Sequence, residues 1–105
     1  MRRGATSTQT FTLPFVLTSP KAVQITYSQF KYLVLVKELP DLTITVSNNK
    51  TNVVLTLSQE ETFKFYPGYA NVQMRIVFSD DQVFSSDIAS FSVENTNNNE
   101  VIPHA

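Results

Sequence analysis

Nucleophilic catalysis requires a base placed beside the nucleophile, and this sequence contains few residues that could act as that base. Cysteine is absent, and the one histidine, His104, lies in a polar stretch rich in asparagine. The serines fall in expected strands and turns, with no histidine close to them in the sequence. The residue inventory therefore predicts no catalytic residues, and we expect that the protein is not an enzyme.

Two pairs of adjacent carboxylates, Glu60-Glu61 and Asp80-Asp81, are the other groups that could carry acid–base chemistry. Adjacent residues of a strand point to opposite faces, so neither pair is arranged to converge on a substrate. We interpret the glutamates as acids at the start of a helical turn and the aspartates as turn residues. Calcium needs several oxygen ligands from one loop, and "SDDQ" offers too few by itself, although Asp41 or Asp87 could add to it. We predict neither a metal nor a cofactor.

An aromatic corner, in which Tyr66 and Tyr69 flank a Pro-Gly pair, could form a platform for sugar rings. Tryptophan is absent, and an aromatic residue before a central strand commonly packs into the open end of a sandwich. We interpret the corner as a joint whose tyrosines seal the core. A carbohydrate-binding or adhesion module, supported also by Tyr27 and Tyr32, stays as the alternative function.

The length, composition and net charge limit the classes of protein to which the chain can belong. The chain has 105 residues, of which 42% are apolar, and its net charge is −1. This length corresponds to one domain with a core of its own. The charge argues against a general affinity for nucleic acid or for anionic membranes. No apolar run approaches the roughly 20 residues that a membrane span needs.

Alternation of apolar and polar residues predicts strands along most of the chain. The clearest stretches are "TQTFTLPFVL", "AVQITYSQ", "LTITV", "VVLTL" and "NVQMRIVF". Pro14 has no amide hydrogen to donate, so the strand that contains it is expected at a sheet edge. Asn48 and Asn49 tolerate positive φ angles and predict the turn of an antiparallel hairpin.

Two further strands depart from simple alternation. "KYLVLVKE" is apolar on both faces, with Leu33 and Leu35 pointing away from its other apolar residues, which predicts a strand covered on both sides or an interface. In "VFSSDIASFSVE" the inward positions change phase after Ile88, so we expect a β-bulge near Asp87 to Ala89.

These elements predict an all-β fold, namely an immunoglobulin-like antiparallel β-sandwich of about seven strands with one short helical turn. The helical turn is indicated by Ser58 and, three residues later, Glu61, which together form a capping box. The sandwich is expected at residues 10–94, between an N-terminal arm at 1–9 and a C-terminal arm at 95–105. The polar composition of both arms is typical of disorder, and we expect them to order on neighbouring subunits.

Partner binding is expected at four apolar residues. Val101 and Ile102 are the anchors of the C-terminal arm. Leu33 and Leu35 would add an apolar patch if the outer face of their strand is left uncovered.

The order of these signals resembles that of small β-sandwich structural proteins encoded by tailed phages of Gram-positive bacteria. The stretch "LTLSQEETFKFYPGYANVQMRIVFSDDQVFSSDIASFSVE" contains a turn with two glutamates, a glycine corner, a "VQ-x-R" strand, an aspartate-containing turn and an "S-x-I" sequence before the final strand. With "FTLPFVL", "VQITYSQ" and "VLVKEL" upstream, the resemblance spans residues 8–94. The chain is also similar in outline to the N-terminal domain of phage baseplate upper proteins. It departs from the pattern at Asp81-Gln82, where a turn glycine is common, and in its asparagine-rich end.

The resemblance implies a phage virion structural protein, made in the host cytoplasm and located in the virion. Such a protein, for example a capsid decoration, neck or baseplate adaptor, acts by self-assembly and by docking on other virion subunits. The partners implied are other virion proteins and copies of the chain itself, with neither nucleic acid nor membrane among them.

Overall fold

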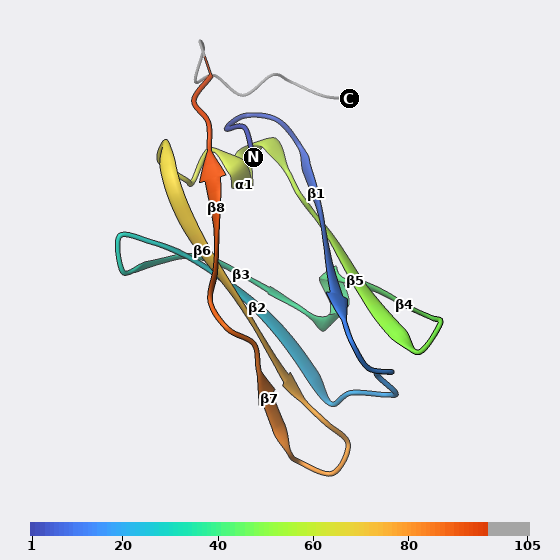
Figure 1. The fold of residues 1–105 in the computed structure, drawn as a ribbon. Helices are drawn as coiled ribbons and strands as arrows, with labels where there is room; N and C mark the ends of the chain where they lie inside the picture. The colour runs from blue at the N-terminus through green and yellow to red at the C-terminus, as the bar shows by residue number, and fades with distance from the viewer. Residues whose placement is uncertain (97–105) are drawn as a thin grey trace.

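The computed structural model describes residues 1–96, which form two antiparallel sheets packed on one core (Figure 1). The smaller sheet has the order β1-β5-β4, with β1 at Ser7–Leu13, β5 at Lys50–Leu57 and β4 at Thr43–Ser47. The larger sheet has β3 at Tyr32–Glu38, β2 at Ala22–Gln29 and β6 at Gly68–Val77 side by side, and β6 then pairs with both β7 (Val83–Ser85) and β8 (Ala89–Val93). Two short helices, the 3₁₀ helix η1 (Leu39–Asp41) and the α-helix α1 (Gln59–Thr62), connect the sheets. The predicted all-β sandwich is confirmed.

The position of β2 distinguishes this sandwich from an immunoglobulin domain. There the second strand pairs with the fifth, in the sheet that also holds the first and fourth. Here β2 lies in the larger sheet between β3 and β6. The β2–β3 hairpin therefore extends the larger sheet, and β3 becomes an edge strand.

The core lies between the sheets and is built from the alternating positions of their strands. The predicted inward residues of β2, Val23, Ile25 and Tyr27, are fully buried. Tyr27 places its hydroxyl against the smaller sheet, where it donates to Gln9 Oε1, and burial raises the pKa of this hydroxyl, with a further increase from the nearby Glu61 carboxylate. The other buried apolar side chains are Leu13, Leu17, Leu35, Val53, Leu55, Leu57, Phe65, Ala70, Val72, Met74, Ile76 and Val93.

Two local predictions about the smaller sheet are confirmed. The strand that leads into Pro14 is β1, and it lies at the edge of its sheet. Asn48 and Asn49 form the two-residue turn between β4 and β5, with φ angles of 52° and 62°. Asparagine adopts this left-handed conformation at little cost, which is why the hairpin closes there.

The last strand is interrupted where the phase change was expected. Val72 pairs with Ala89 and Arg75 with Ser85, so two residues of β6 face the three residues 86–88. The extra residue confirms the predicted irregularity. The prediction that Ile88 points inward is wrong, because its side chain lies in the unpaired segment and is 64% exposed.

The N-terminal residues do not form a separate arm. The Met1 ammonium donates to the Ser92 carbonyl at 2.9 Å, and the Glu94 amide donates to the Met1 carbonyl at 2.8 Å. The Arg2 guanidinium pairs with the Glu94 carboxylate at 2.8 Å, and β1 already begins at Ser7. Backbone and side-chain bonds within the domain therefore order residues 1–9 without a neighbouring subunit, contrary to prediction. Most of the C-terminal arm, including Val101 and Ile102, lies outside the described residues.

The predicted capping box begins α1. The Ser58 Oγ accepts from the Glu61 amide at 3.2 Å, and the Glu61 Oε1 accepts from the Ser58 amide at 2.9 Å. The other Glu61 oxygen pairs with Lys37 Nζ of β3 at 2.7 Å. The helical turn is thereby tied to the edge of the larger sheet.

Replacing Ser58 by alanine should remove one capping bond and lower the free energy of unfolding by about 1 kcal/mol. Chemical denaturation measures this change. An unfolding midpoint equal to that of the wild type would show that the cap does not stabilise the domain.

The Lys37–Glu61 pair should make stability depend on pH in the acid range. Burial by itself raises the pKa of Glu61, but the bonds from Lys37 and Ser58 outweigh it and hold the pKa below its ordinary value of 4.5. A carboxylate with a lowered pKa in the folded state contributes stability above its ordinary pKa and loses it as the pH falls through the folded value. Glu61→Gln should therefore flatten the dependence of the unfolding free energy on pH below 4.5. If the unfolding free energies of the variant and the wild type fell equally with pH below 4.5, the prediction would be wrong.

Candidate functional site

The β3 strand leaves one edge of the larger sheet without a partner strand among residues 1–96. Its pairing with β2 shifts at Val34, so that Leu33 faces Ser28 while Leu35 faces Tyr27. The bulge places Leu33 on the outer face, 66% exposed, and turns Leu35 into the core, 7% exposed. Leu33 thus lies on an uncovered face, the condition for an apolar patch, whereas the prediction that Leu35 shares this face is wrong, because strict alternation does not hold across the bulge.

The tyrosines of the Pro-Gly corner are also placed differently from the prediction. Tyr66 is 66% exposed and Tyr69 is 75% exposed, so neither seals the core. Phe65 does so instead, fully buried with its ring edge-on to Tyr27 at 5.8 Å and to Phe91 at 5.9 Å between centroids. The chain turns sharply between α1 and β6, and only one side chain of Phe65-Tyr66 can point inward.

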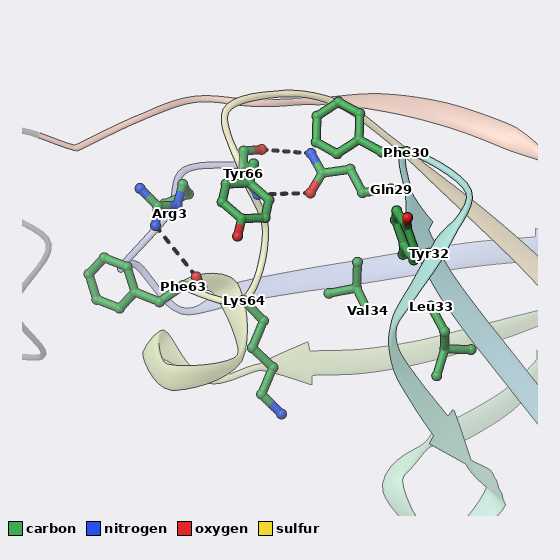
Figure 2. Close-up of a pocket in the computed structure, with 9 residues that line it drawn as sticks. All are labelled: Arg3, Gln29, Phe30, Tyr32, Leu33, Val34, Phe63, Lys64 and Tyr66. Atoms are coloured by element: carbon green, nitrogen blue, oxygen red, sulfur yellow. Dashed lines mark hydrogen bonds between the residues drawn. The ribbon is translucent and has the colours of Figure 1, made fainter.

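A groove of about 870 Å³ opens between the β2–β3 hairpin and the connection from α1 to β6. Figure 2 shows the hairpin residues on one side of it and the connection on the other, with Gln29 reaching across. We call it the hairpin groove; its lining residues are Arg3, Gln29, Phe30, Tyr32, Leu33, Val34, Phe63, Lys64 and Tyr66.

Gln29 holds the two sides of the hairpin groove together. Its Oε1 accepts from the Tyr66 amide at 2.8 Å, and its Nε2 donates to the Tyr66 carbonyl at 2.6 Å (Figure 2). The Nε2 also donates to the Tyr69 carbonyl at 3.3 Å. The Gln29 side chain is almost fully buried, so these part-buried bonds satisfy its amide group within the protein. The position of Tyr66 is thereby tied to the end of β2.

Exposed aromatic rings lie around the hydrogen bonds between Gln29 and Tyr66. Phe30 lies 6.2 Å from Tyr66 between ring centroids, and both rings are about two-thirds exposed. Tyr32 is 77% exposed and follows the turn. Tyr27, also predicted to support sugar binding, is buried in the core and cannot take part. Three large rings left in solvent at one place are typical of an interaction surface.

The turn that presents Phe30 is conformationally unfavourable. Phe30 and Lys31 form the two-residue turn between β2 and β3 with φ angles of 53° and 66°. A bulky side chain rarely adopts this left-handed conformation, which costs roughly 1–2 kcal/mol per residue. The β4–β5 turn uses asparagine at both equivalent positions. Backbone strain of this kind is concentrated at functional sites, so the turn supports a binding role for the hairpin.

Positive charge lies at the groove, and among residues 1–96 no carboxylate lines it. Lys64 is exposed on the connection side, and Lys31 is exposed at the tip of the hairpin. Neither forms an ion pair within residues 1–96. The Arg3 guanidinium lies over the Phe63 ring at 5.5 Å and donates to the Asn95 side chain at 2.8 Å. The surface is therefore aromatic and cationic.

Lys31→Gly should raise the free energy of unfolding by up to about 1 kcal/mol, because glycine adopts the left-handed conformation without steric cost. Thermal or denaturant unfolding measures the change. Asn49→Gly in the other hairpin is the matched control and should change stability by only a few tenths of a kcal/mol. Equal effects of the two substitutions would show that the β2–β3 turn is not strained.

The predicted carboxylate pairs serve local structure. The Asp80 Oδ1 accepts from the Gln82 amide at 3.1 Å, and Asp81 has a φ of 69° and pairs with Lys21. The glutamates lie in the first turn of α1. In the described part of the chain, no group of three or more acidic, histidine or cysteine side chains is arranged to hold a metal ion.

Comparison of the sequence with protein-family models and with curated proteins gave no match. Within residues 1–96, no helix has the length and apolar character needed to cross a membrane. The hairpin groove is thus the feature of the structure that carries a functional proposal.

Proposed function

We propose that the protein is a virion structural protein of a tailed phage that acts by docking, through the hairpin groove, on other virion subunits or on copies of itself. The single observation that carries the docking role is the exposed aromatic cluster of Phe30, Tyr32 and Tyr66 on a strained turn. Aromatic side chains are enriched at the energetic centres of protein interfaces. The assignment to a virion rests on the sequence resemblance.

The two sides of the hairpin groove are also joined by bonds within the free domain. Gln29 joins the α1–β6 connection to β2, and the Lys37–Glu61 pair joins α1 to β3. A surface that is ordered before binding loses less entropy when a partner arrives. This favours a docking role over a chemical one for a site that is lined by few acid–base groups.

The test is whether the protein is a component of purified phage particles. Mass spectrometry and immunogold labelling should find it there in multiple copies. The double variant Phe30→Ser with Tyr66→Ser should reduce incorporation by at least about tenfold, as loss of an interface centre does. Tyr69→Ser, an exposed tyrosine outside the groove, is the control and should be incorporated normally. Absence of the protein from particles would contradict the virion assignment.

Carbohydrate binding is the second candidate, and the exposure of the corner tyrosine favours it. Phe30 and Tyr66 present tilted rings beside the polar groups of Arg3 and Lys64, an arrangement that suits sugar rings and their hydroxyls. A glycan array separates the two candidates. Specific glycan binding that Tyr66→Ser abolishes and Tyr69→Ser preserves would support an adhesion module instead of subunit docking.

A further inference from the structure

We propose that the hairpin groove binds residues 100–102 of a second copy of the chain, so that each subunit carries both halves of a self-assembly contact. The inference rests on the proposed function and names the partner segment of that same site. It joins a surface that the structure describes to a short sequence outside the described residues.

The chemistry of the two partners is complementary. The hairpin groove combines aromatic and aliphatic side chains with the cations Arg3 and Lys64, Lys31 lies next to it at the tip of the hairpin, and none of its lining residues within 1–96 is a carboxylate. In the stretch "NTNNNEVIPHA", Glu100 is the one carboxylate side chain after Glu94, and it is followed directly by Val101 and Ile102. An acidic residue next to two β-branched apolar residues matches a surface that is apolar with a positive rim.

The groove can also take an extended segment. Residues 32–34 of β3 line it, and the edge of β3 opposite β2 has no partner strand among residues 1–96. A peptide that adds to such an edge gains backbone hydrogen bonds, and its alternate side chains enter the neighbouring pockets. Val101 and Ile102 have the β-branched side chains that favour this extended conformation.

The described chain ends close to the hairpin groove. The Asn95 side chain accepts from Arg3, which itself lines the hairpin groove, so the described chain ends next to the site. From Thr96 to Glu100 the chain can span at most roughly 14 Å, so the groove that receives residues 100–102 must belong to a subunit in direct contact. Because the segment and the groove are different surfaces, the contact is either exchanged reciprocally in a twofold dimer or repeated in a larger ring or a filament.

The test is charge reversal in the full-length chain, measured by sedimentation velocity over a range of protein concentrations. Lys64→Glu and Glu100→Lys should each raise the apparent dissociation constant for self-association by about tenfold or more, because a like charge replaces an attractive pair. The double variant should recover most of the wild-type affinity. Lys50→Glu, an exposed residue at the β4–β5 hairpin, is the matched control and should associate normally.

Two results would overturn the inference. The first is self-association unchanged by either single reversal. The second is a wild-type chain that stays monomeric at every concentration, as it would if the segment occupied the groove of its own copy. The particle experiment is independent of both. Protein present in particles, with Glu100→Lys incorporated normally, would keep the proposed function and reject only this contact.

Discussion

Replacing Phe65 by alanine is expected to lower the free energy of unfolding by about 3–5 kcal/mol, the usual cost of removing a buried aromatic side chain. The Phe65 ring is fully buried and contacts Tyr27 and Phe91 edge-on, so its loss leaves a cavity where α1 passes into β6. In a domain of this size such a loss should lower the thermal midpoint by more than about 10 °C.

The control for Phe65→Ala is Tyr69→Ala, which removes an aromatic ring that is 75% exposed on β6. Surface substitutions of this kind usually change stability by about 0.5 kcal/mol or less. Differential scanning calorimetry compares the two variants directly. Equal midpoints would mean that Phe65 does not close the core.

Gln29→Met should be the second most damaging substitution, with an expected loss of about 2–4 kcal/mol. Methionine has nearly the same length and can fill the same space, but it donates no hydrogen bond and accepts only weakly. The amide and carbonyl of Tyr66 would then lose their partner at a part-buried site, and each unsatisfied buried group costs about 1–3 kcal/mol.

The Gln29 substitution also has a functional consequence that separates it from a core mutation. With the connection released from β2, Tyr66 would no longer be held beside Phe30, so self-association or particle incorporation should weaken even at temperatures where the domain stays folded. Gln24→Met is the matched control, because Gln24 is half-buried near the start of β2, away from the groove. It should leave both stability and binding close to the wild type. Normal binding by a folded Gln29→Met variant would show that the hairpin groove does not need this bond.

Local sequence patterns determined the parts of the structure that depend on neighbouring residues alone. The capping box of Ser58 and Glu61, the asparagine turn after β4 and the edge position of the strand before Pro14 each follow from the conformational preference of a few adjacent residues. The inward faces of β2 and β6 were equally predictable, since alternation in a regular strand assigns every side chain to one face.

Alternation predicted the side-chain directions of the irregular strands only in part. The phase change before β8 was visible in the sequence because apolar residues mark both registers there. The bulge at Val34 was not visible, because β3 is apolar at every position from 32 to 36, and the pairing with β2 alone decides that Leu35 is buried and Leu33 exposed. Likewise, the polar N-terminal residues resembled a free arm, and only their pairing with the segment after β8, distant in sequence, ordered them.

The candidate site depended almost entirely on tertiary structure. Phe30 and Lys31 carry none of the turn residues that indicate a tight hairpin, so the sequence by itself gave no sign of an exposed ring there. The sequence determined that an aromatic corner exists at Tyr66. The direction in which α1 leaves β5 decides which ring of this corner enters the core. It places Phe65 over Tyr27 and turns Tyr66 toward Phe30. Binding surfaces formed by residues far apart in sequence arise from such packing, and no local pattern encodes it.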